Sequence, residues 1–241
     1  MSSVLISIAT YNEIENLPRL VDTIFEFVPS AHVLIIDDAS PDGTGDWCDQ
    51  KAAEDSRLRC IHREGKLGLG TATILGLKTA CESDYDFVVN MDADFSHHPK
   101  YLPALIAGMD EGSGGPVDVM VGTRYRPGGG VEGWPLSRKV MSRMVNLYAR
   151  LCLGLRVSDC SGSFRCYRTS LLNQIDFSEV RSTGYSFFEE ILWHLRRAGA
   201  TFGELPIVFV NRELGQSKIS MREAVKAIAV IGTTGLRSWF R

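Results

Sequence analysis

Long hydrophobic runs are missing from this sequence. None of its 241 residues lies in a stretch of about 18 consecutive apolar residues, the length that a membrane-spanning helix needs. The N-terminal MSSVLISIATYNE also lacks the basic start and the apolar length of a signal peptide. We therefore expect neither a spanning helix nor a secretory leader, and we expect the protein to work in the cytoplasm.

Cysteine is present, but in no metal-binding pattern. The six cysteines form no C-x-x-C pair and no spacing typical of zinc ligands, which favours reduced, mostly buried thiols in a cytosolic compartment. An excess of basic residues is also missing, because 26 Lys and Arg stand against 29 Asp and Glu and the net charge is −3. Without an overall positive field, we expect no nucleic-acid partner.

Short β-branched runs alternate with amphipathic segments along most of the chain. A hydrophobic content of 44% over 241 residues is enough for one substantial core. The predicted strands are Val4–Ala9, Val33–Asp37, Leu58–His62, Phe87–Met91, Val117–Val121 and Glu204–Val210. The predicted helices are 16–28, Thr44–Asp55, Leu69–Cys81, Pro99–Met109, Leu136–Leu153 and Phe187–Ala198, with a last helical segment from about Met221.

This alternation predicts a single α/β domain with a mostly parallel, Rossmann-like sheet. Strand–helix–strand units cover both faces of such a sheet with helices, and ligands bind beyond the carboxyl ends of the strands. We expect this domain to span residues 1–218. A C-terminal helical segment, residues 219–241, would follow it and face a membrane or a partner protein.

Acidic residues follow three of the predicted strands. Asp92 and Asp94 come directly after Phe87–Met91, the pair Asp37-Asp38 ends the second strand, and Glu13 closes the Thr-Tyr-Asn-Glu stretch after the first. Residues i and i+2 of an extended segment share a face, so Asp92 and Asp94 can point at one ligand. An isolated D-x-D is more often a solvated turn than a metal site. Three acidic clusters at one sheet edge instead favour a site for Mg²⁺ or Mn²⁺, which also take ligands from substrate phosphates.

Basic residues follow two further strands and are candidates for holding phosphate groups. Arg124 comes after the fifth strand, and Arg212 and Lys218 come after the last one; for each, a surface charge is the alternative. His97 and His98 stand beside the acidic pair. Adjacent strand residues point in opposite directions and no third soft ligand accompanies them, so a structural or supporting role is favoured over a zinc site.

With these positions located, the sequence closely resembles the polyprenyl- (dolichyl-) phosphate mannose synthases, inverting family-two glycosyltransferases of the GT-A fold. The resemblance covers nearly the whole chain in family order. It rests on TYNEIENLP, IIDDASPDGTGD, KLGLGTA, MDADFSHHPKYLP, GTRY, GGVEGWPLSRKVMSR, SDCSGSFRCYR and ELPIVFVNRELGQSK. Two positions depart from it, because Ala9 replaces a usual proline and Phe188 stands where relatives often have Gln.

The resemblance implies a donor site in three parts. The nucleotide base and ribose would contact Tyr11, Glu13, Ile36 and Asp38. The metal would be held by Asp92, Asp94 and Ser96, with Asp94 as its principal ligand and Ala93 contacting the donor. The donor phosphates would be bound by Arg124, Arg212 and Lys218.

The resemblance also implies an acceptor side and a set of catalytic residues. Arg138 and Ser142 match positions that hold the acceptor phosphate, so the residues expected to act directly in transfer are Asp94, Arg124, Arg138 and Ser142. The implied reaction moves mannose from GDP-mannose to a polyprenyl phosphate. An acceptor phosphate is mostly dianionic at neutral pH, so the reaction needs no general base. Either Glu189 or Glu190 could orient a sugar hydroxyl.

Three other functions stay open on the sequence alone. Another nucleotide sugar such as UDP-glucose could serve as donor, because the sequence does not define the base pocket. A metal-dependent nucleotidyltransferase is disfavoured, since TYNE occupies the place of its Gly-rich, Lys-containing signature, and Gly65–Ala72 lacks the spacing of a P-loop. A non-catalytic nucleotide-sugar-binding protein is disfavoured by the intact Asp92, Asp94 and Arg124.

The implied lipid acceptor predicts peripheral contact with a membrane. The stretch Met221–Arg241 places Met221, Val225, Ile228, Leu236 and Trp239 toward one helical face, with Arg222, Lys226 and Arg237 nearby. Such a helix could instead pack on the domain's own core or on a membrane-anchored partner protein. The Gly232-Thr-Thr-Gly235 interruption weakens a continuous amphipathic helix.

Overall fold

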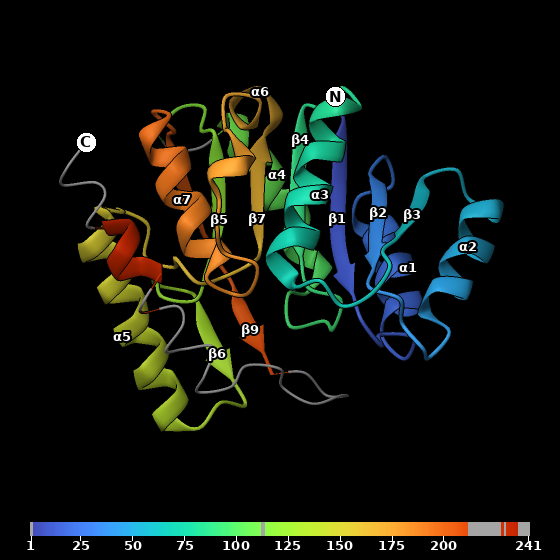
Figure 1. Cartoon of the computed structure of the whole chain (residues 1–241), viewed down its shortest axis with the longest axis horizontal. Helices are drawn as coiled ribbons and strands as arrows, with labels where there is room; N and C mark the ends of the chain where they lie inside the picture. Colours follow the sequence, from blue (N-terminus) through green and yellow to red (C-terminus); the bar gives the residue numbers. More distant parts are fainter. Residues whose placement is uncertain (1, 112–113, 212–227, 229, 236–241) are drawn as a thin grey trace.

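A seven-stranded sheet forms the centre of the molecule (Figure 1). The computed structural model describes residues 2–111, 114–211, 228 and 230–235. The strand order is β3-β2-β1-β4-β7-β5-β8, and all pairs are parallel except those of β7, which runs antiparallel to β4 and β5. The strands are β1 (Val4–Thr10), β2 (His32–Asp37), β3 (Leu58–His62), β4 (Phe87–Met91), β5 (Val119–Thr123), β7 (Arg165–Arg168) and β8 (Phe202–Pro206).

Helices cover both faces of this sheet, which confirms the predicted α/β architecture. Alternate residues of a strand point to opposite faces, so Leu34 and Ile36 of β2 join one buried cluster while Val33 and Ile35 join the other. The first cluster includes α3 (Leu69–Glu82), α5 (Leu136–Leu153) and α7 (Phe187–Arg197). The second includes α1 (Leu17–Phe27), α2 (Thr44–Glu54) and α4 (Leu102–Glu111). Short turns of helix lie at η1 (Pro99–Tyr101), α6 (Thr169–Leu172) and η2 (Phe177–Glu179).

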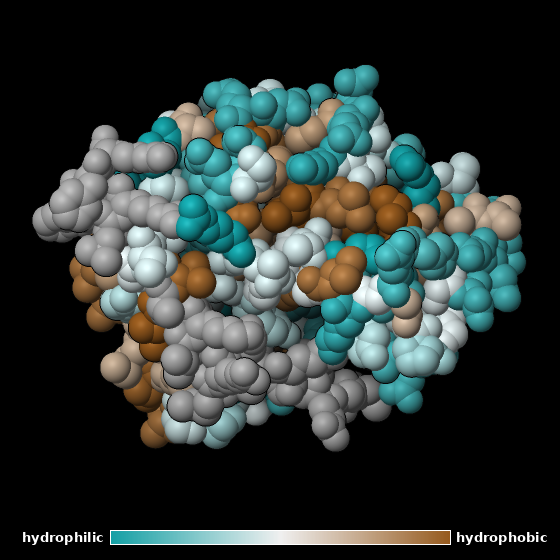
Figure 2. Space-filling view, viewed as in Figure 1, coloured by the Kyte–Doolittle hydropathy of each residue, from teal (hydrophilic) through white to brown (hydrophobic). Residues whose placement is uncertain are grey.

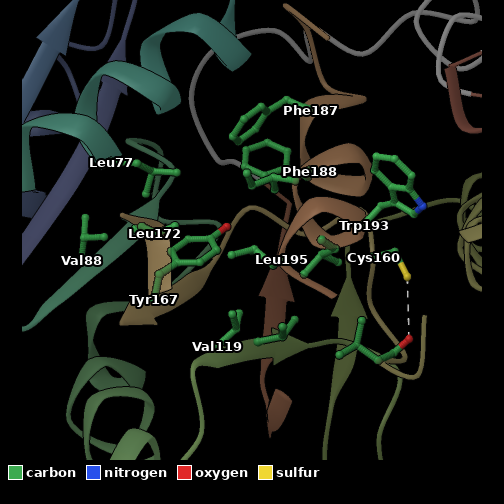
Figure 3. Close-up of a cluster of buried hydrophobic side chains, with 14 of the residues drawn as sticks. Leu77, Val88, Val119, Cys160, Tyr167, Leu172, Phe187, Phe188, Trp193 and Leu195 are labelled. Atoms are coloured by element: carbon green, nitrogen blue, oxygen red, sulfur yellow. Dashed lines mark hydrogen bonds between the residues drawn. The ribbon is translucent and has the colours of Figure 1, made fainter. Parts of the chain in front are cut away.

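Aromatic residues fix the start of α7 in the core. Phe187 and Phe188 meet edge to face at 5.4 Å, and Trp193 and Tyr167 belong to the same buried cluster (Figure 3). Each large apolar side chain buried in this way stabilises the fold by about 1.5–3 kcal/mol. The first turn of α7 is therefore a rigid support for whatever polar groups it presents.

The structure divides the last predicted strand and adds elements that the sequence pattern did not predict. Residues 204–210 contribute to β8 and to β9 (Val208–Val210), and β9 pairs with β6 (Gly130–Glu132) in a separate two-stranded sheet. Pro206 has no N–H to donate to a sheet, and the chain changes partners directly after it. The strands β6 and β7 were not predicted, and β5 begins two residues later than predicted, at Val119.

Part of the C-terminal segment packs on the domain. The predicted boundary at residue 218 lies outside the described residues, as do Met221, Val225, Leu236 and Trp239. Within the described part, Ile231 is buried in the cluster that also contains α5 and α7. None of the described helices is both long enough and apolar enough to cross a bilayer.

Candidate active site

A cavity of about 920 Å³ lies where the carboxyl ends of β1, β2, β4 and β5 meet. Left-handed backbone at non-glycine residues marks three of these strand ends, at Asn12 (φ 58°) after β1, Ala39 (φ 53°) after β2 and Phe95 (φ 58°) after β4. Such conformations cost free energy and tend to gather at functional sites. The chain turns sharply here, and polar side chains from several strand ends reach one space.

The acidic pair after β4 lies in this cavity, as predicted. Asp92 and Asp94 both line it, with Ala93 and Ser96 beside them. Asp94 is 6% exposed and accepts a hydrogen bond from the backbone N–H of Ser96 at 3.0 Å. Asp92 accepts a hydrogen bond from the Ser163 hydroxyl at 2.7 Å. These hard oxygen donors suit Mg²⁺ or Mn²⁺, which complete their coordination with water and substrate oxygens.

The two histidines support the site from behind. His97 is buried, stacks on Phe164 at 5.2 Å, and has its Nδ1 3.6 Å from Asp92 Oδ2. Desolvation lowers the pKa of His97, so the ring is neutral near pH 7. His98 instead accepts a hydrogen bond from the N–H of Lys100 at the start of η1. Neither belongs to a three-donor metal cluster of the described residues.

Three of the residues expected to contact the nucleotide line the cavity, whereas Ile36 does not. Tyr11, Glu13 and Asp38 are on its wall, and Lys66 lies over the Tyr11 ring at 4.2 Å. Ile36 is fully buried in the core cluster beneath this wall. Its position in β2 points the side chain at Gly76 of α3, so a contact with the base would have to come from its backbone.

Arg63 organises this end of the cavity and was not predicted from the sequence. Its guanidinium forms a buried ion pair with Asp38 and donates to the Thr71 hydroxyl at 2.7 Å. It also donates to the carbonyl of Gly68 at 3.2 Å. Arg63 therefore ties the end of β2 to the Gly-rich stretch that begins α3.

The same glycine-rich stretch makes a close backbone contact with residues 182 and 183. Gly70 donates its N–H to the carbonyl of Thr183 at 2.8 Å. A Cβ on Gly68 would lie 2.4 Å from that carbonyl oxygen, and one on Gly70 would lie 2.6 Å from the oxygen of Ser182. Only glycine allows this approach, which brings the cavity wall formed by residues 181–186 against α3.

Arg124 lies in the cavity, and a partner holds it in place. Asp159 accepts hydrogen bonds from Arg124 Nε and Nη2, both at 2.7 Å, and the pair is almost fully buried. This mutual contact raises the pKa of Arg124 and lowers that of Asp159 against their desolvation, so both stay charged. Nη2 also donates to the Ser161 hydroxyl at 2.9 Å, and the described residues give Nη1 no hydrogen bond. Arg124 is thus a pre-oriented cation with one side left for an anion.

The predicted acceptor-side residues come from α5 and lie in the same cavity. Arg138 and Ser142 both line it, and the Ser142 hydroxyl is 2.7 Å from the Tyr125 hydroxyl. The Arg138 guanidinium lies over the Trp134 ring at 3.9 Å, and the Arg124 guanidinium lies 5.5 Å from that ring. The Trp134 ring therefore contacts both guanidinium groups.

Two expected phosphate ligands, Arg212 and Lys218, lie outside the described residues. Conversely, Asp159, Arg63, Trp134 and the 181–186 wall were not assigned roles from the sequence. Their partners are distant in sequence, as with the 35 residues that separate Arg124 from Asp159. The one available signal for Asp159 is its place in SDCSGSFRCYR, a stretch that belongs to the resemblance.

Comparison with known proteins supports the glycosyltransferase expectation. Residues 5–176 match the family described as Glycosyl transferase family 2. The chain is 43% identical over 233 residues to an undecaprenyl-phosphate mannosyltransferase of Micrococcus luteus, covering 97% of this chain and 94% of that protein. It is 41% identical over 235 residues to a polyprenol monophosphomannose synthase of Mycolicibacterium smegmatis, covering 96% of this chain and 87% of that protein.

A solved structure confirms the predicted GT-A-type fold. Glucosyl-3-phosphoglycerate synthase of Mycobacterium tuberculosis, in complex with Mn²⁺, UDP and glucosyl-3-phosphoglycerate, superposes with a TM-score of 0.66. The match covers 98% of this chain and 79% of that one at 20% identity, which establishes the fold. Taken with the family match and the two full-length relatives, this chain belongs to glycosyl transferase family 2 and is a glycosyltransferase.

Proposed function

We propose that this enzyme transfers mannose from GDP-mannose to a polyprenyl phosphate, with inversion at the anomeric carbon and with Mg²⁺ or Mn²⁺. The observation that carries the proposal is one cavity that brings the acidic pair, the anchored Arg124 and the acceptor-side residues of α5 together. The names of the two relatives, which specify mannosyl transfer to undecaprenyl phosphate and synthesis of a polyprenol monophosphomannose, support the substrate class.

The residues on the donor side would bind a nucleoside diphosphate sugar by its base and its phosphates. Tyr11, Glu13 and Asp38 would contact the base and ribose, with Arg63 holding the Asp38 carboxylate in place. Arg124 would offer Nη1 to a phosphate oxygen, and because Asp159 already fixes its orientation, little side-chain entropy is lost on binding. Arg212 and Lys218 would add further positive charge.

Asp92 and Asp94 would hold the divalent cation, with Ser96 beside them. The cation, when bound, neutralises charge on the departing diphosphate. Without it, the two carboxylates would repel the same phosphates. The buried hydrogen bond from Ser96 N–H orients Asp94 before any ligand arrives.

The acceptor needs positioning rather than activation. A phosphate monoester has its second pKa near 6 and is already a nucleophilic dianion at neutral pH. Arg138 would hold this dianion, and Ser142 would donate a hydrogen bond to it, with the Tyr125 hydroxyl fixing the rotamer of Ser142. Attack in line with the departing diphosphate would convert an α-linked donor into a β-linked product. Bringing two anions together in this geometry is the main task of the protein.

A polyprenyl acceptor resides in a membrane, and the exposed face of α5 offers a peripheral contact. Its exposed apolar residues recur every three or four positions and form one stripe, namely Leu136, Val140, Met144, Leu147 and Leu151. The same helix has four basic and no acidic residues, Arg138, Lys139, Arg143 and Arg150. Apolar atoms gather over α5 at the lower left of Figure 2. This combination suits an anionic membrane surface.

A transfer assay tests the proposal. Radiolabelled GDP-mannose and radiolabelled UDP-glucose are each offered with mixed polyprenyl phosphates in Mg²⁺ or Mn²⁺, and label is counted in the organic phase. We expect label from GDP-mannose, acid-labile as a sugar phosphodiester. Label from UDP-glucose alone would replace the proposed donor, and no organic label from either would overturn the proposed reaction.

A further inference from the structure

Two adjacent glutamates in the first turn of α7 have different environments. The Glu190 carboxylate accepts hydrogen bonds from the backbone N–H groups of Arg181, at 3.1 Å, and Ser182, at 2.8 Å, and so anchors the wall formed by residues 181–186. Glu189 lines the cavity itself and is 3% exposed. Its Oε2 has no hydrogen-bond partner among the described residues.

A buried carboxyl oxygen without a hydrogen bond is costly, and two guanidinium groups, those of Arg165 and Arg124, act on Glu189 electrostatically. Arg165 donates through Nη1 to the carbonyl oxygen of Phe188 at 2.7 Å and through Nη2 to that of Cys160 at 2.6 Å. Its Nε has no hydrogen-bond partner among the described residues, and Arg124 is paired with Asp159. Desolvation raises the pKa of Glu189 to about 7, while a hydrogen bond from its own backbone N–H and the charges of Arg165 and Arg124 oppose the shift and Asp159 adds to it. Buried acceptors are normally satisfied, so this carboxyl, which lines the cavity, needs a partner that the described residues do not supply.

The chemistry of the cavity restricts what that partner can be. A phosphate group would be repelled by the carboxylate. A divalent cation already has the acidic pair Asp92 and Asp94 on the wall of the same cavity. A neutral hydroxyl satisfies a carboxyl in either protonation state, because it can donate to the ionised form or accept from the neutral one. In a nucleotide-sugar donor, such hydroxyls belong to the hexose and the ribose, and the ribose side of the cavity is lined by Glu13 and Asp38.

We infer that Glu189 binds a hydroxyl of the transferred hexose and thereby selects the donor by its sugar. The inference rests on the proposed function in taking a nucleotide sugar as the ligand of this cavity. It assigns the two glutamates separate roles, since Glu190 holds the wall and Glu189 contacts substrate. Because the rigid aromatic cluster behind α7 fixes its first turn, the carboxyl has little freedom to find another partner.

Binding measurements test this assignment without requiring turnover. Calorimetry in Mn²⁺ compares GDP with GDP-mannose, and UDP with UDP-glucose, on the wild-type enzyme and on Glu189→Met. We expect Glu189→Met to change the affinity for the nucleoside diphosphate by no more than about twofold. Its affinity for the matching nucleotide sugar should fall by about tenfold or more, because one buried hydrogen bond to a charged group is lost. Equal weakening of both ligands, or of neither, would overturn the inference.

Deoxy donors then identify the hydroxyl. Donor analogues that lack one hexose hydroxyl each are compared by kcat/KM, using whichever nucleotide sugar the wild-type enzyme transfers. With the wild-type enzyme, the kcat/KM of one analogue should be at least about tenfold below that of the intact donor. With Glu189→Met, the same analogue and the intact donor should have similar kcat/KM, because the variant has already lost the contact. If every analogue loses the same factor in both enzymes, Glu189 does not contact the sugar.

Glu190→Gln is the matched control. It should lower the melting temperature, since it weakens the anchoring of Arg181 and Ser182, and it should keep the wild-type ranking of the deoxy analogues. Glu189→Met should keep or raise the melting temperature, because it removes an unpaired buried carboxyl. A transfer assay that fails with sugar binding intact would refute the proposed reaction and not the role of Glu189.

Discussion

Arg124 and Asp159 form a buried ion pair whose side chains are 7% and 0% exposed. Asp159 also accepts from the backbone N–H groups of Arg124, at 3.1 Å, and Gly162, at 3.0 Å. Such a pair adds little net stability compared with apolar residues, yet breaking it leaves an uncompensated charge in the core. The pair is therefore best understood as a device that orients a cation toward the cavity.

We predict that Asp159→Asn lowers the free energy of unfolding by about 3 kcal/mol at pH 7, measured by urea denaturation. The native pKa of Asp159 is lowered, so the pair contributes fully above the ordinary carboxyl pKa and its contribution is lost as the pH falls below it. The control is Asp110→Asn, which removes an Arg168 pair with side chains 26% and 51% exposed. That change should cost less than about 1 kcal/mol, and equal costs for the two variants would contradict the argument.

Glu189 gives stability the opposite pH dependence. Its native pKa is raised from 4.5 to about 7, so folding is penalised above pH 7 and is not penalised below the unfolded value. Glu189→Met removes the penalty. The free energy of unfolding of this variant, minus that of the wild type, should rise by an amount on the order of 3 kcal/mol when the pH is raised from 5 to 8. Parallel denaturation at the two pH values checks this, and a relative loss of stability at pH 8 would contradict it.

The acidic pair predicts an absolute requirement for a divalent cation. Asp94→Ala should reduce kcat/KM by at least about 100-fold, on the order of 3 kcal/mol of transition-state stabilisation, and excess EDTA should abolish transfer. The control is Asp49→Ala, because Asp49, Cys60 and His62 form another metal-type cluster with ligand atoms within 4.8 Å of one another, away from the cavity. That variant should keep wild-type activity in Mg²⁺ or Mn²⁺. Activity of Asp94→Ala near wild type would refute the metal site.

At the scale of elements, hydrophobic periodicity predicted the parallel strands and the long helices because their burial repeats with a regular period. It missed β7, whose four residues include the buried Arg165, a charge that no apolar pattern contains. It joined β8 to β9 because a change of pairing partner leaves no local signal. Of the two β2-end residues that the resemblance assigns to the nucleotide pocket, Asp38 lines the cavity and the side chain of Ile36 is buried in the core.

The residues of the candidate site were also predictable only in part. Residues at strand ends were predictable, because parallel strands bring their carboxyl ends to one edge. The partners that hold those residues were not, since Asp159, Arg63 and Trp134 act through contacts that only the folded chain creates. The choice between Glu189 and Glu190 also needed the structure, because adjacent helical residues look alike in sequence and face different surroundings.

One face of α5 lines the cavity, and its exposed apolar face should bind membranes. We predict that Leu147→Ser with Leu151→Ser weakens flotation with anionic vesicles by at least about tenfold, because each leucine contributes on the order of 1 kcal/mol or more when it enters the interface. These side chains are 54% and 74% exposed, so the fold should tolerate the change. Phe27→Ser on α1, at an exposed apolar residue away from α5, is the control. Unchanged flotation of the double variant would place the contact elsewhere.

At the scale of the whole molecule, α5 would link the proposed membrane contact to the proposed reaction. Its N-terminal half contributes Arg138 and Ser142 to the cavity, and Met141 and Val145 line the same space. The apolar stripe lies on the exposed face of that helix. A polyprenyl chain lying in the bilayer could therefore present its phosphate to the cavity without leaving the membrane, while the nucleotide enters from the water-facing strand ends.

This arrangement predicts that the membrane face matters only for membrane-borne acceptors. The Leu147→Ser and Leu151→Ser double variant should transfer sugar to a short, water-soluble isoprenyl phosphate at a kcat/KM within about twofold of wild type. With a long polyprenyl phosphate embedded in vesicles, its rate should fall about tenfold or more, in step with the lost flotation. Arg138→Ala, by contrast, should impair both acceptors while GDP affinity stays unchanged, because Arg138 would contact the phosphate common to the two. Equal loss by the double variant on both acceptors would mean that the stripe serves the cavity itself, and the proposed membrane role of α5 would be wrong.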